Sequence, residues 1–555
     1  MDHRPPIALL ALLALLACNG AAPDLILVGR VWTGDSTRPW AEGFAIEGDS
    51  IAAVGDSAEI LALAGAGTEV VRGAMVVPGF RDDHTHFFWG GFQLTSVDLK
   101  DAATPEEFIR RIAAHAKTLP RGEWIQGGTW DHELWPGTPL PRKEWIDSVT
   151  PDHPVFVGRY DGHMSLANSL ALRLAGVDRT TVDVPGGEIV RGPPRLARPL
   201  PDGEPTGVFK DAAQSLVQRV IPAPSPERMD SALARALRHA ATLGVTGISL
   251  VSANWDEVAA FRRARARGAL TLRTSVYIAI ENWRSAAESL RVNGPGDQWL
   301  RVAGVKGFVD GSLGSTTAWF YDPYVDAPQT TGLVVTGLDS LRSWIARSDS
   351  AGLQVVVHAI GDRANDWLLG VFDSVATSNG SRDRRFRIEH AQHLRREDIP
   401  RFAALTVVPS MQPYHAIDDG RWAEKRIGPE RIKTTYAFRS LLDAGARLAF
   451  GSDWTVAPLD PMQGVYAAVT RRTLDGKNPK GWVPEEKITV EEALRAYTVA
   501  NAWGTYAEGY TGTIRPGFKA DIAVLDQDLT AIPPEQIGAA KVVLTVVGGR
   551  VVYRR

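Results

Sequence analysis

Two histidines lie two residues apart at the end of an apolar run. His84 and His86 belong to the segment Val77-Pro-Gly-Phe-Arg-Asp-Asp-His-Thr-His-Phe87. On a β-strand, residues i and i+2 point to the same side, so both imidazoles would face one space. Two converging imidazoles form half of a transition-metal site. An H-x-H pair also occurs among ordinary surface and core histidines, so its meaning depends on polar residues elsewhere in the chain.

Other apolar strands also end, or nearly end, on a polar residue. His358, His390 and Asp453 each follow an apolar run, and Lys306 lies inside another. An unpaired buried charge is costly, so these groups need partners. The spacing from His358 to His390 is about one strand-helix unit and that from His390 to Asp453 about two. We therefore expect the strand ends to converge so that their side chains satisfy one another through metal ions.

The elements that carry these residues alternate between short apolar strands and capped helices. Helix starts are indicated at Thr104-Pro-Glu-Glu107, at Ser225-Pro226 and at Thr489 with Glu492. With the strand that ends at His84, eight strands are expected; the other seven are in 244–251, 272–280, 301–309, 353–358, 385–390, 405–411 and 447–453. Repeated strand-helix units favour an α/β fold, a metal-bearing (β/α)8 TIM barrel. A doubly wound open sheet is the alternative, but no Gly-rich phosphate turn follows the first strand.

Both ends of the chain are rich in β-strands and differ from the middle. Residues 19–78 and 511–555 are expected to form one small β-sandwich, and residues 79–510 the barrel. Residues from about 88 to 224 are too many for one loop and carry strands of their own. We expect them to form a large insertion after barrel strand 1, placed over the C-terminal face where barrel active sites lie.

The N-terminus and the composition limit location and partners. The chain has 555 residues, a formal net charge of −3 and one cysteine, Cys18. Residues 1–17 resemble a bacterial lipoprotein signal peptide, with cleavage before Cys18 and a lipid anchor on its sulfur. This predicts an exported lipoprotein on a cell-envelope membrane; a plain secretory signal is the alternative. Without a long basic run, nucleic acid is not an expected partner, and the membrane is expected to be contacted only through the lipid.

Several motifs together resemble the amidohydrolase superfamily, most closely its family 3 (YtcJ-like) branch. They run from about Asp24 to the C-terminus and comprise Pro78-Gly-Phe-Arg-Asp-Asp-His-Thr-His, Val305-Lys-Gly-Phe-Val-Asp-Gly-Ser, His358-Ala-Ile-Gly-Asp-Arg-Ala-Asn, Arg387-Ile-Glu-His-Ala-Gln, Gly451-Ser-Asp-Trp and Gly512-Thr-Ile-Arg-Pro-Gly-Phe-Lys-Ala-Asp. The resemblance implies a metal-bearing barrel with a β-sandwich built from both termini.

The resemblance also implies roles for the strand-end residues. His84 and His86 would bind one divalent metal, and His358 and His390 a second; one or two zinc ions are expected. Asp453 would touch the metal site and act as the catalytic proton acceptor.

Lys306 stands where some amidohydrolases carry an N6-carboxylated lysine that bridges two metals. A charged lysine paired with Asp310 is the alternative.

The insertion supplies candidate substrate-binding residues. Asp161 and His163 match a D-G-H step of the family, and Asp211 stands where the family often has glutamate, which puts a metal role for Asp211 in doubt. Weaker candidates are Asn168, Asp131-His132 and His393.

The expected function is metal-dependent hydrolysis of a non-peptide carbon–nitrogen bond in a small-molecule amide or cyclic amide. Alternatives are a mononuclear heterocycle deaminase and a non-catalytic surface binding lipoprotein. The substrate and the oligomeric state are not indicated, because long loops build the pocket.

Overall fold

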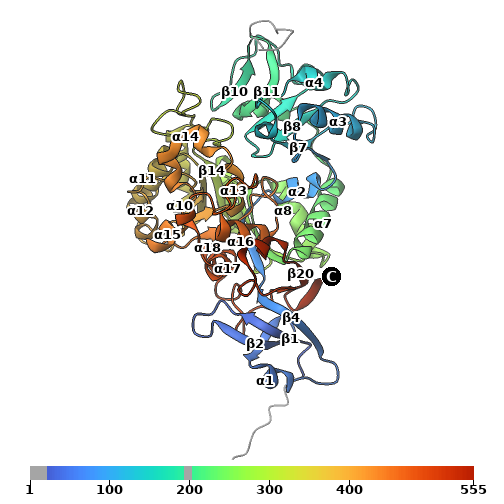
Figure 1. The fold of residues 1–555 in the computed structure, drawn as a ribbon, viewed down its shortest axis with the longest axis vertical. Coiled ribbons are helices and arrows are strands. Elements are labelled where there is room, and N and C mark those ends of the chain that lie inside the picture. The colour runs from blue at the N-terminus through green and yellow to red at the C-terminus, as the bar shows by residue number, and fades with distance from the viewer. Residues whose placement is uncertain (1–21, 193–202) are drawn as a thin grey trace, which may run out of the picture.

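The computed structural model describes residues 22–192 and 203–555, which form three β-sheets with flanking helices (Figure 1). The middle of the chain lies between a sheet from the two termini at one end and a sheet from residues 97–211 at the other. The expected signal peptide and Cys18 lie outside the described residues. None of the described helices has the length and apolar character needed to cross a membrane.

Eight parallel strands form the central sheet. They are β5 (Phe80–Thr85), β12 (Val245–Ala253), β13 (Arg273–Ala279), β14 (Leu300–Phe308), β15 (Gln354–Ala359), β16 (Arg387–His390), β17 (Val408–Met411) and β18 (Ala449–Phe450). Their order follows the chain, and a parallel bridge from Thr85 to Trp454 joins the first strand to the residues after the last. The nearly closed barrel is confirmed, and the doubly wound alternative is wrong.

Helices between successive strands and after the last strand cover the barrel because their apolar faces pack on its outer surface. They include α7 (Pro226–Thr242), α8 (Trp255–Ala266), α9 (Trp283–Asn293), α10 (Leu338–Ser350), α11 (Asp362–Ser378), α12 (Ile399–Ala404), α15 (Phe438–Asp443), α16 (Pro461–Thr470), α17 (Val490–Tyr497) and α18 (Val499–Gly504). Ser225 caps α7, and Thr489 forms a capping box with Glu492 at α17, as the sequence predicts.

The two termini share one seven-stranded sheet. Its strands are β1 (Leu25–Trp32), β2 (Trp40–Glu47), β3 (Ser50–Gly55), β4 (Glu69–Pro78), β19 (Ile522–Leu525), β20 (Val542–Val547) and β21 (Arg550–Arg554). Hydrogen bonds connect all seven into one sheet, so a two-layered sandwich is not confirmed. The sheet is fixed to the barrel because buried Arg273 on β13 donates to both carboxylate oxygens of Asp521, at 2.5 and 2.9 Å.

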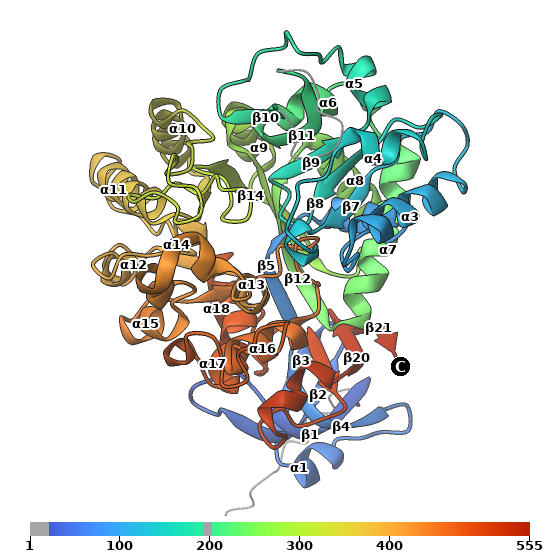
Figure 2. The same ribbon diagram turned by 45° about the horizontal axis from the view of Figure 1, so that its top comes forward.

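Between β5 and β12 the chain forms its own six-stranded sheet. The strands are β6 (Val97–Asp98), β7 (Gly127–Trp130), β8 (Phe156–Arg159), β9 (Met164–Ala167), β10 (Gly187–Arg191) and β11 (Pro205–Asp211), flanked by α3 (Pro105–Ala116), α4 (Lys143–Asp147), α5 (Ser169–Ala175) and α6 (Ser215–Gln218). Figure 2 shows this sheet at one end of the barrel, close to β5 and β12. Ion pairs connect this part of the chain to the segment between β17 and β18: Arg421 pairs with Asp131 at 3.1 Å and Arg426 with Glu133 at 2.7 Å.

Candidate active site

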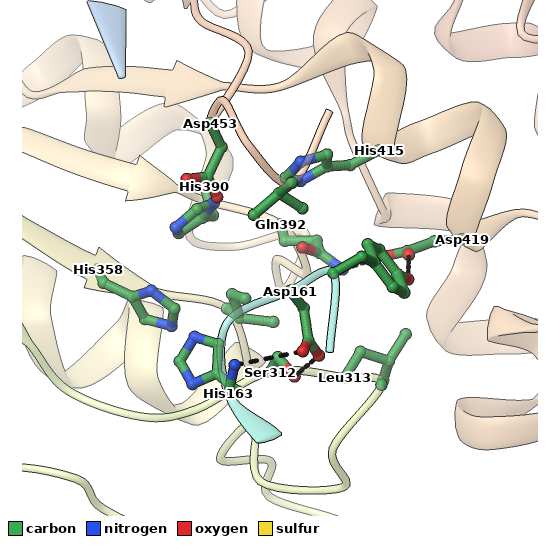
Figure 3. Close-up of a pocket in the computed structure, with 14 residues that line it drawn as sticks. Asp161, His163, Ser312, Leu313, His358, His390, Gln392, His415, Asp419 and Asp453 are labelled. Atoms are coloured by element: carbon green, nitrogen blue, oxygen red, sulfur yellow. Dashed lines mark hydrogen bonds between the residues drawn. The ribbon is translucent and has the colours of Figure 1, made fainter. Parts of the chain in front are cut away.

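The strand-end residues meet at one end of the barrel, in part as expected. His84 lies on β5, and His86 directly follows this strand and precedes α2 (Phe87–Gln93). His390 is the last residue of β16, and Asp453 lies three residues after β18. In Figure 3, Asp453 and His390 lie close together on one side of a pocket, with His358 nearby.

His84, His86 and Asp453 offer ligand atoms within 4.8 Å of one another. Asp453 Oδ1 lies 3.4 Å from His84 Nε2 and 3.2 Å from His86 Nε2. This buried oxygen nevertheless makes no hydrogen bond within the described part of the chain. Two imidazole nitrogens and an unsatisfied carboxylate oxygen form a donor set that suits a divalent transition metal.

Glu389 sets the orientation of His84. The Nδ1 of His84 is hydrogen-bonded to Glu389 Oε2, which also accepts from Ser410 Oγ at 3.0 Å. The other oxygen of Glu389 accepts from Arg387 at 2.7 Å. All these groups are buried. The bond at Nδ1 leaves Nε2 free to face Asp453, the arrangement that carboxylates impose on metal-binding histidines.

A second group of possible ligands shares Asp453. Ligand atoms of His390, His415 and Asp453 also lie within 4.8 Å of one another. His415 belongs to α13 (Pro413–Asp419), which follows β17, and Figure 3 places it beside His390 and Asp453. His390 Nδ1 is held by Gln412 Oε1 at 2.7 Å, so its Nε2 remains free.

His358 is less available than the sequence suggests. Its ring centroid is 4.5 Å from that of His390, so the predicted pair is adjacent. However, His358 Nε2 lies 3.0 Å from the carbonyl oxygen of Gly311 and 3.5 Å from Asp310 Oδ1. A carbonyl oxygen is an acceptor, so this nitrogen carries the proton when the ring is neutral. The Nδ1 of His358 is then the nitrogen with a free lone pair.

Lys306 reaches the same centre from β14. Its Nζ is 3.5 Å from His84 Nε2, and the side chain is buried. Burial lowers the pKa of Lys306 to about 8. The alternative partner, Asp310, accepts instead from the backbone N–H groups of Trp319 at 2.7 Å, Ile360 at 3.0 Å and Gly361 at 2.8 Å. The geometry therefore favours a position at the metal site over a Lys306–Asp310 pair.

The protonation states suit metal binding. Burial lowers the pKa of His84 to about 4 and lowers that of His390 well below its ordinary value. Burial alone would raise the pKa of Asp453, but the neighbouring imidazoles of His84 and His86 hold it well below its usual range. At neutral pH His84 and His390 thus present neutral imidazoles and Asp453 a carboxylate, which are the ligand forms of these side chains.

A cavity of about 40 Å³ opens beside these groups. Its lining comprises Tyr160, Asp161, His163, Ser312, Leu313, Gly314, His358, Ile360, His390, Gln392, His415, Asp419, Asp453 and Val456. The insertion contributes three of them, next to the barrel loop that follows β14 (Figure 3).

The predicted substrate-binding residues surround one wall of the cavity. Asp161 accepts from Arg159 and from Ser312 Oγ, both at 2.6 Å. His163 Nδ1 is hydrogen-bonded to Asp211 Oδ1 at 2.5 Å, and its ring lies 5.1 Å from that of His358. Burial opposes protonation of His163, but the hydrogen bond and charge of Asp211 raise its pKa. Asp211 itself does not line the cavity. It is hydrogen-bonded to His163, which does.

The weaker candidates have structural roles. Asn168 caps α5 and bonds to Val155 N at 3.0 Å. Asp131 and His132 contact buried Arg159 at 3.1 and 3.3 Å. His393 is bonded to Thr435 Oγ1 at 2.8 Å and to Gln392 Nε2 at 3.1 Å, so it touches a residue of the cavity wall.

Three residues of the site were missed by the sequence analysis. Glu389 stands inside a motif recognised for His390, Gln412 directly follows strand β17, and His415 lies three residues further on. The available signal was a polar residue at the end of a seventh strand, which is the same signal that identified His358 and His390.

The fold and the site define a (β/α)8 barrel whose strand ends carry side chains that could hold a metal ion, and comparisons identify its family. A profile of the amidohydrolase family matches residues 71–553. The chain therefore belongs to the amidohydrolase family.

Individual relatives support the same assignment. The chain is 38% identical over 96% of its length to Protein LONG AFTER FAR-RED 3 of Arabidopsis thaliana, covering 92% of that protein. It is 31% identical to putative amidohydrolase YtcJ of Bacillus subtilis, covering 87% of this chain and 90% of that protein. It is 28% identical to N-substituted formamide deformylase of Arthrobacter pascens, covering 96% and 98%.

A solved structure is similar over almost its whole length. An uncharacterized metal-dependent hydrolase from Pyrococcus horikoshii OT3 is 30% identical, with a TM-score of 0.72, covering 92% of this chain and 99% of that one. The recognition of a YtcJ-like amidohydrolase and the metal-dependent hydrolase class are confirmed.

Proposed function

We propose that the protein hydrolyses a non-peptide carbon–nitrogen bond in a small-molecule amide or cyclic amide. The observation that carries this proposal is the position of Asp453. Its carboxylate belongs both to the group with His84 and His86 and to the group with His390 and His415, and its Oδ1 is buried and without a hydrogen bond in the described residues. A carboxylate in this position serves both as a ligand and as a proton acceptor.

The residues present fit one or two divalent cations, with zinc the expected metal. His84, His86, His390 and Asp453 would hold them, with Lys306 within reach. When bound, such a cation polarises a carbonyl group and lowers the pKa of water to about 7. Asp453 accepts a proton from the attacking water and delivers it to the nitrogen of the leaving amine. The carbon–nitrogen bond breaks, and a carboxylic acid and an amine result.

A small acyl group is supported by the similarity to a protein named N-substituted formamide deformylase. The cavity places His163 and Asp161 beside the metal-binding residues His390 and Asp453. We infer that the acyl part of the substrate is short, formyl being the simplest case, and that His163 and Asp161 hold its polar atoms.

Lys306 is proposed to carry an N6-carboxylate. Burial lowers its pKa, so more of the amine is neutral and can attack carbon dioxide than for an exposed lysine. The product is a carbamate anion, which is a ligand for cations where the ammonium group is not.

Location is a separate proposal that depends on the N-terminal sequence alone. Cleavage before Cys18 and lipid attachment to its sulfur would place the enzyme on a cell-envelope membrane. Mass spectrometry of the mature N-terminus from the native host tests this. An N-terminus without lipid would contradict it.

One experiment tests the function. Purified protein is analysed for bound metals and assayed for amine release from N-substituted formamides, N-acyl amines, hydantoins and lactams. We expect hydrolysis of at least one class, lost on chelation and restored by zinc. Release of ammonia from heterocycles by protein with one bound metal would favour the deaminase. Metal-independent ligand binding without turnover would favour a binding protein.

A further inference from the structure

One carboxylate in the cavity wall has no positively charged partner. Asp419 is the last residue of α13, lines the cavity and is only 7% exposed. The arginines whose charge acts on it, Arg159 and Arg421, are in ion pairs with other carboxylates, and Asp419 is in no ion pair within residues 22–192 and 203–555. A buried carboxylate without a cation is costly, so it either keeps a proton or takes a cation from outside the chain.

The other aspartates of this region already use both arginines. Arg159 pairs with Asp131 at 3.1 Å and with Asp161 at 2.6 Å. Arg421 also pairs with Asp131 at 3.1 Å, and it contacts Asp418 as well. Two guanidinium groups thus serve three carboxylates, and neither is left for the fourth.

The two oxygens of the Asp419 carboxylate have different surroundings. Oδ2 accepts hydrogen bonds from Gln392 Nε2 at 2.8 Å and from Tyr436 Oη at 2.7 Å. Oδ1 contacts only the hydroxyl group of Tyr160, at 3.5 Å, which is the outer limit for a hydrogen bond. A carboxylate oxygen has two lone pairs, so Oδ1 has unused acceptor capacity. Because Tyr160 and Gln392 also line the cavity, this capacity is available at the cavity wall.

We propose that Asp419 binds an ammonium group of the substrate, on the amine side of the bond that is hydrolysed. The proposal rests on the amide hydrolysis proposed above and adds a residue that determines specificity. Figure 3 shows His358 and His390 on one side of the pocket and Asp419 on the other. A substrate with its amide at the metal-binding residues would therefore extend its far end toward Asp419. The substrate class is a short N-acyl diamine, in which one nitrogen is acylated and the other is charged.

The surroundings of Asp419 suit this role. An ammonium group has three N–H donors and no acceptor, so it matches an oxygen with free lone pairs. Gln392 and Tyr436 come from two other segments of the chain and fix the carboxylate before a ligand arrives, which lowers the entropic cost of binding. Burial raises the pKa of Asp419 to about 7, so the carboxyl group is charged at pH 8 and a bound cation stabilises that form.

The neighbouring residue is a matched control. Asp418 is equally buried, but it is paired with Arg421 and does not line the cavity. Asp418→Asn and Asp419→Asn each replace one buried carboxylate with an amide of the same shape. In Asp419→Asn the amide oxygen can still accept from Gln392 and Tyr436, while its NH₂ group, a donor, replaces the free acceptor. A general effect of losing a buried charge would appear in both variants.

The first test compares two formamides of equal length at pH 8. N-formyl-1,3-diaminopropane ends in an ammonium group, and N-butylformamide has a methyl group in its place. We expect the zinc-loaded wild type to show a kcat/KM at least about tenfold higher for the charged substrate. Asp419→Asn should lose this preference, mainly through a higher KM for the charged substrate, and Asp418→Asn should keep it. Equal kcat/KM values in the wild type, or an unchanged preference in Asp419→Asn, would overturn the proposal.

A binding measurement separates this inference from the proposed function. Calorimetry with 1,3-diaminopropane and n-butylamine needs no turnover. The wild type and Asp418→Asn should bind the diamine at least about tenfold more tightly than the monoamine, and Asp419→Asn should not. Equal binding of both amines by the wild type would overturn the proposal even if Asp419→Asn did not fold. Diamine binding that depends on Asp419, in a protein that hydrolyses neither formamide, would refute amide hydrolysis and leave the ammonium site standing.

Discussion

Asp453 and His84 are joined twice, through the backbone and through their side chains. The Asp453 N–H donates to the carbonyl oxygen of His84 at 2.8 Å, and Asp453 Oδ1 lies 3.4 Å from His84 Nε2. The contact that closes the barrel between its first and last strands is thus also the contact that brings the carboxylate to the imidazoles. The closure of the barrel and the geometry of the candidate metal site therefore depend on the same two residues.

Replacing Asp453 with asparagine should remove activity without unfolding the protein. The residue has φ 58°, a conformation that asparagine tolerates better than most residues. Because Oδ1 makes no hydrogen bond in the described residues, little structure depends on the charge. We expect kcat to fall by about 10²–10⁴-fold with Tm close to that of the wild type. Substantial activity in Asp453→Asn would refute its role as proton acceptor.

Glu389 is predicted to act through His84. Glu389→Gln keeps the shape of the side chain but weakens the hold on His84 Nδ1 and on Arg387. Residues that orient metal-binding histidines typically change metal affinity or activity by about 10–100-fold. We expect zinc affinity and kcat to fall within that range.

Glu257→Gln is the control for Glu389→Gln, since Glu257 is also buried but caps α8 away from the site. If both variants lost zinc affinity equally, the orienting role of Glu389 would be disproved.

If Lys306 is carboxylated, the recovery of activity by metal-free enzyme on addition of metal should depend on carbon dioxide. Only the neutral amine reacts, and burial lowers the pKa of Lys306 to about 8 from 10.5. The neutral fraction therefore increases as the pH rises, reaches one half at about pH 8 and levels off at higher pH. Metal-free enzyme given Zn²⁺ should regain activity faster with bicarbonate than without it, and at a fixed concentration of dissolved carbon dioxide the effect of pH should follow this curve.

The corresponding variant is Lys306→Ala, whose lost activity should be partly restored by a small acid such as propionate, which replaces the missing carboxylate. Recovery rates indifferent to bicarbonate, together with no rescue by propionate, would exclude carboxylation.

The free energy of unfolding should depend on pH because Glu257 is buried. Burial raises the pKa of Glu257 from 4.5 to about 7 in the folded protein. Between these values the native state binds more protons than the unfolded state, so stability falls as pH rises from about 4.5 to about 7 and is then constant. The shift corresponds to roughly 3 kcal/mol.

Urea unfolding of wild type and Glu257→Gln at pH 5 and pH 8 measures this contribution. The variant should gain stability relative to the wild type at pH 8, because glutamine carries no charge to bury. An unchanged difference between the two pH values would show that Glu257 does not titrate in this range.

The barrel and part of the site could be predicted because both follow from local patterns. Runs such as Gln354-Val-Val-Val-His358 indicate a buried strand and show which polar residue stands at its end. The pairing of His84 with His86 follows from the period of two in a strand. Such reasoning places residues at the barrel mouth but not the atoms by which they interact.

The remaining features depend on contacts between distant segments. The ring of His358 is turned by the carbonyl of Gly311, which comes from the loop after another strand. His415 lies on a helix, where strand periodicity gives no information. Glu389 and His84 are 305 residues apart, so their hydrogen bond is visible only in three dimensions. The single sheet from the termini likewise depends on pairing between β4 and β19.

Because His84 and Asp453 come from opposite ends of the barrel sequence, the metal centre cannot assemble in order of synthesis. A nascent chain that has emerged only as far as α15 already contains His84, His86, His358, His390 and His415 but lacks the carboxylate that both ligand groups share. A chain that ends before Asp453 therefore cannot complete either ligand group.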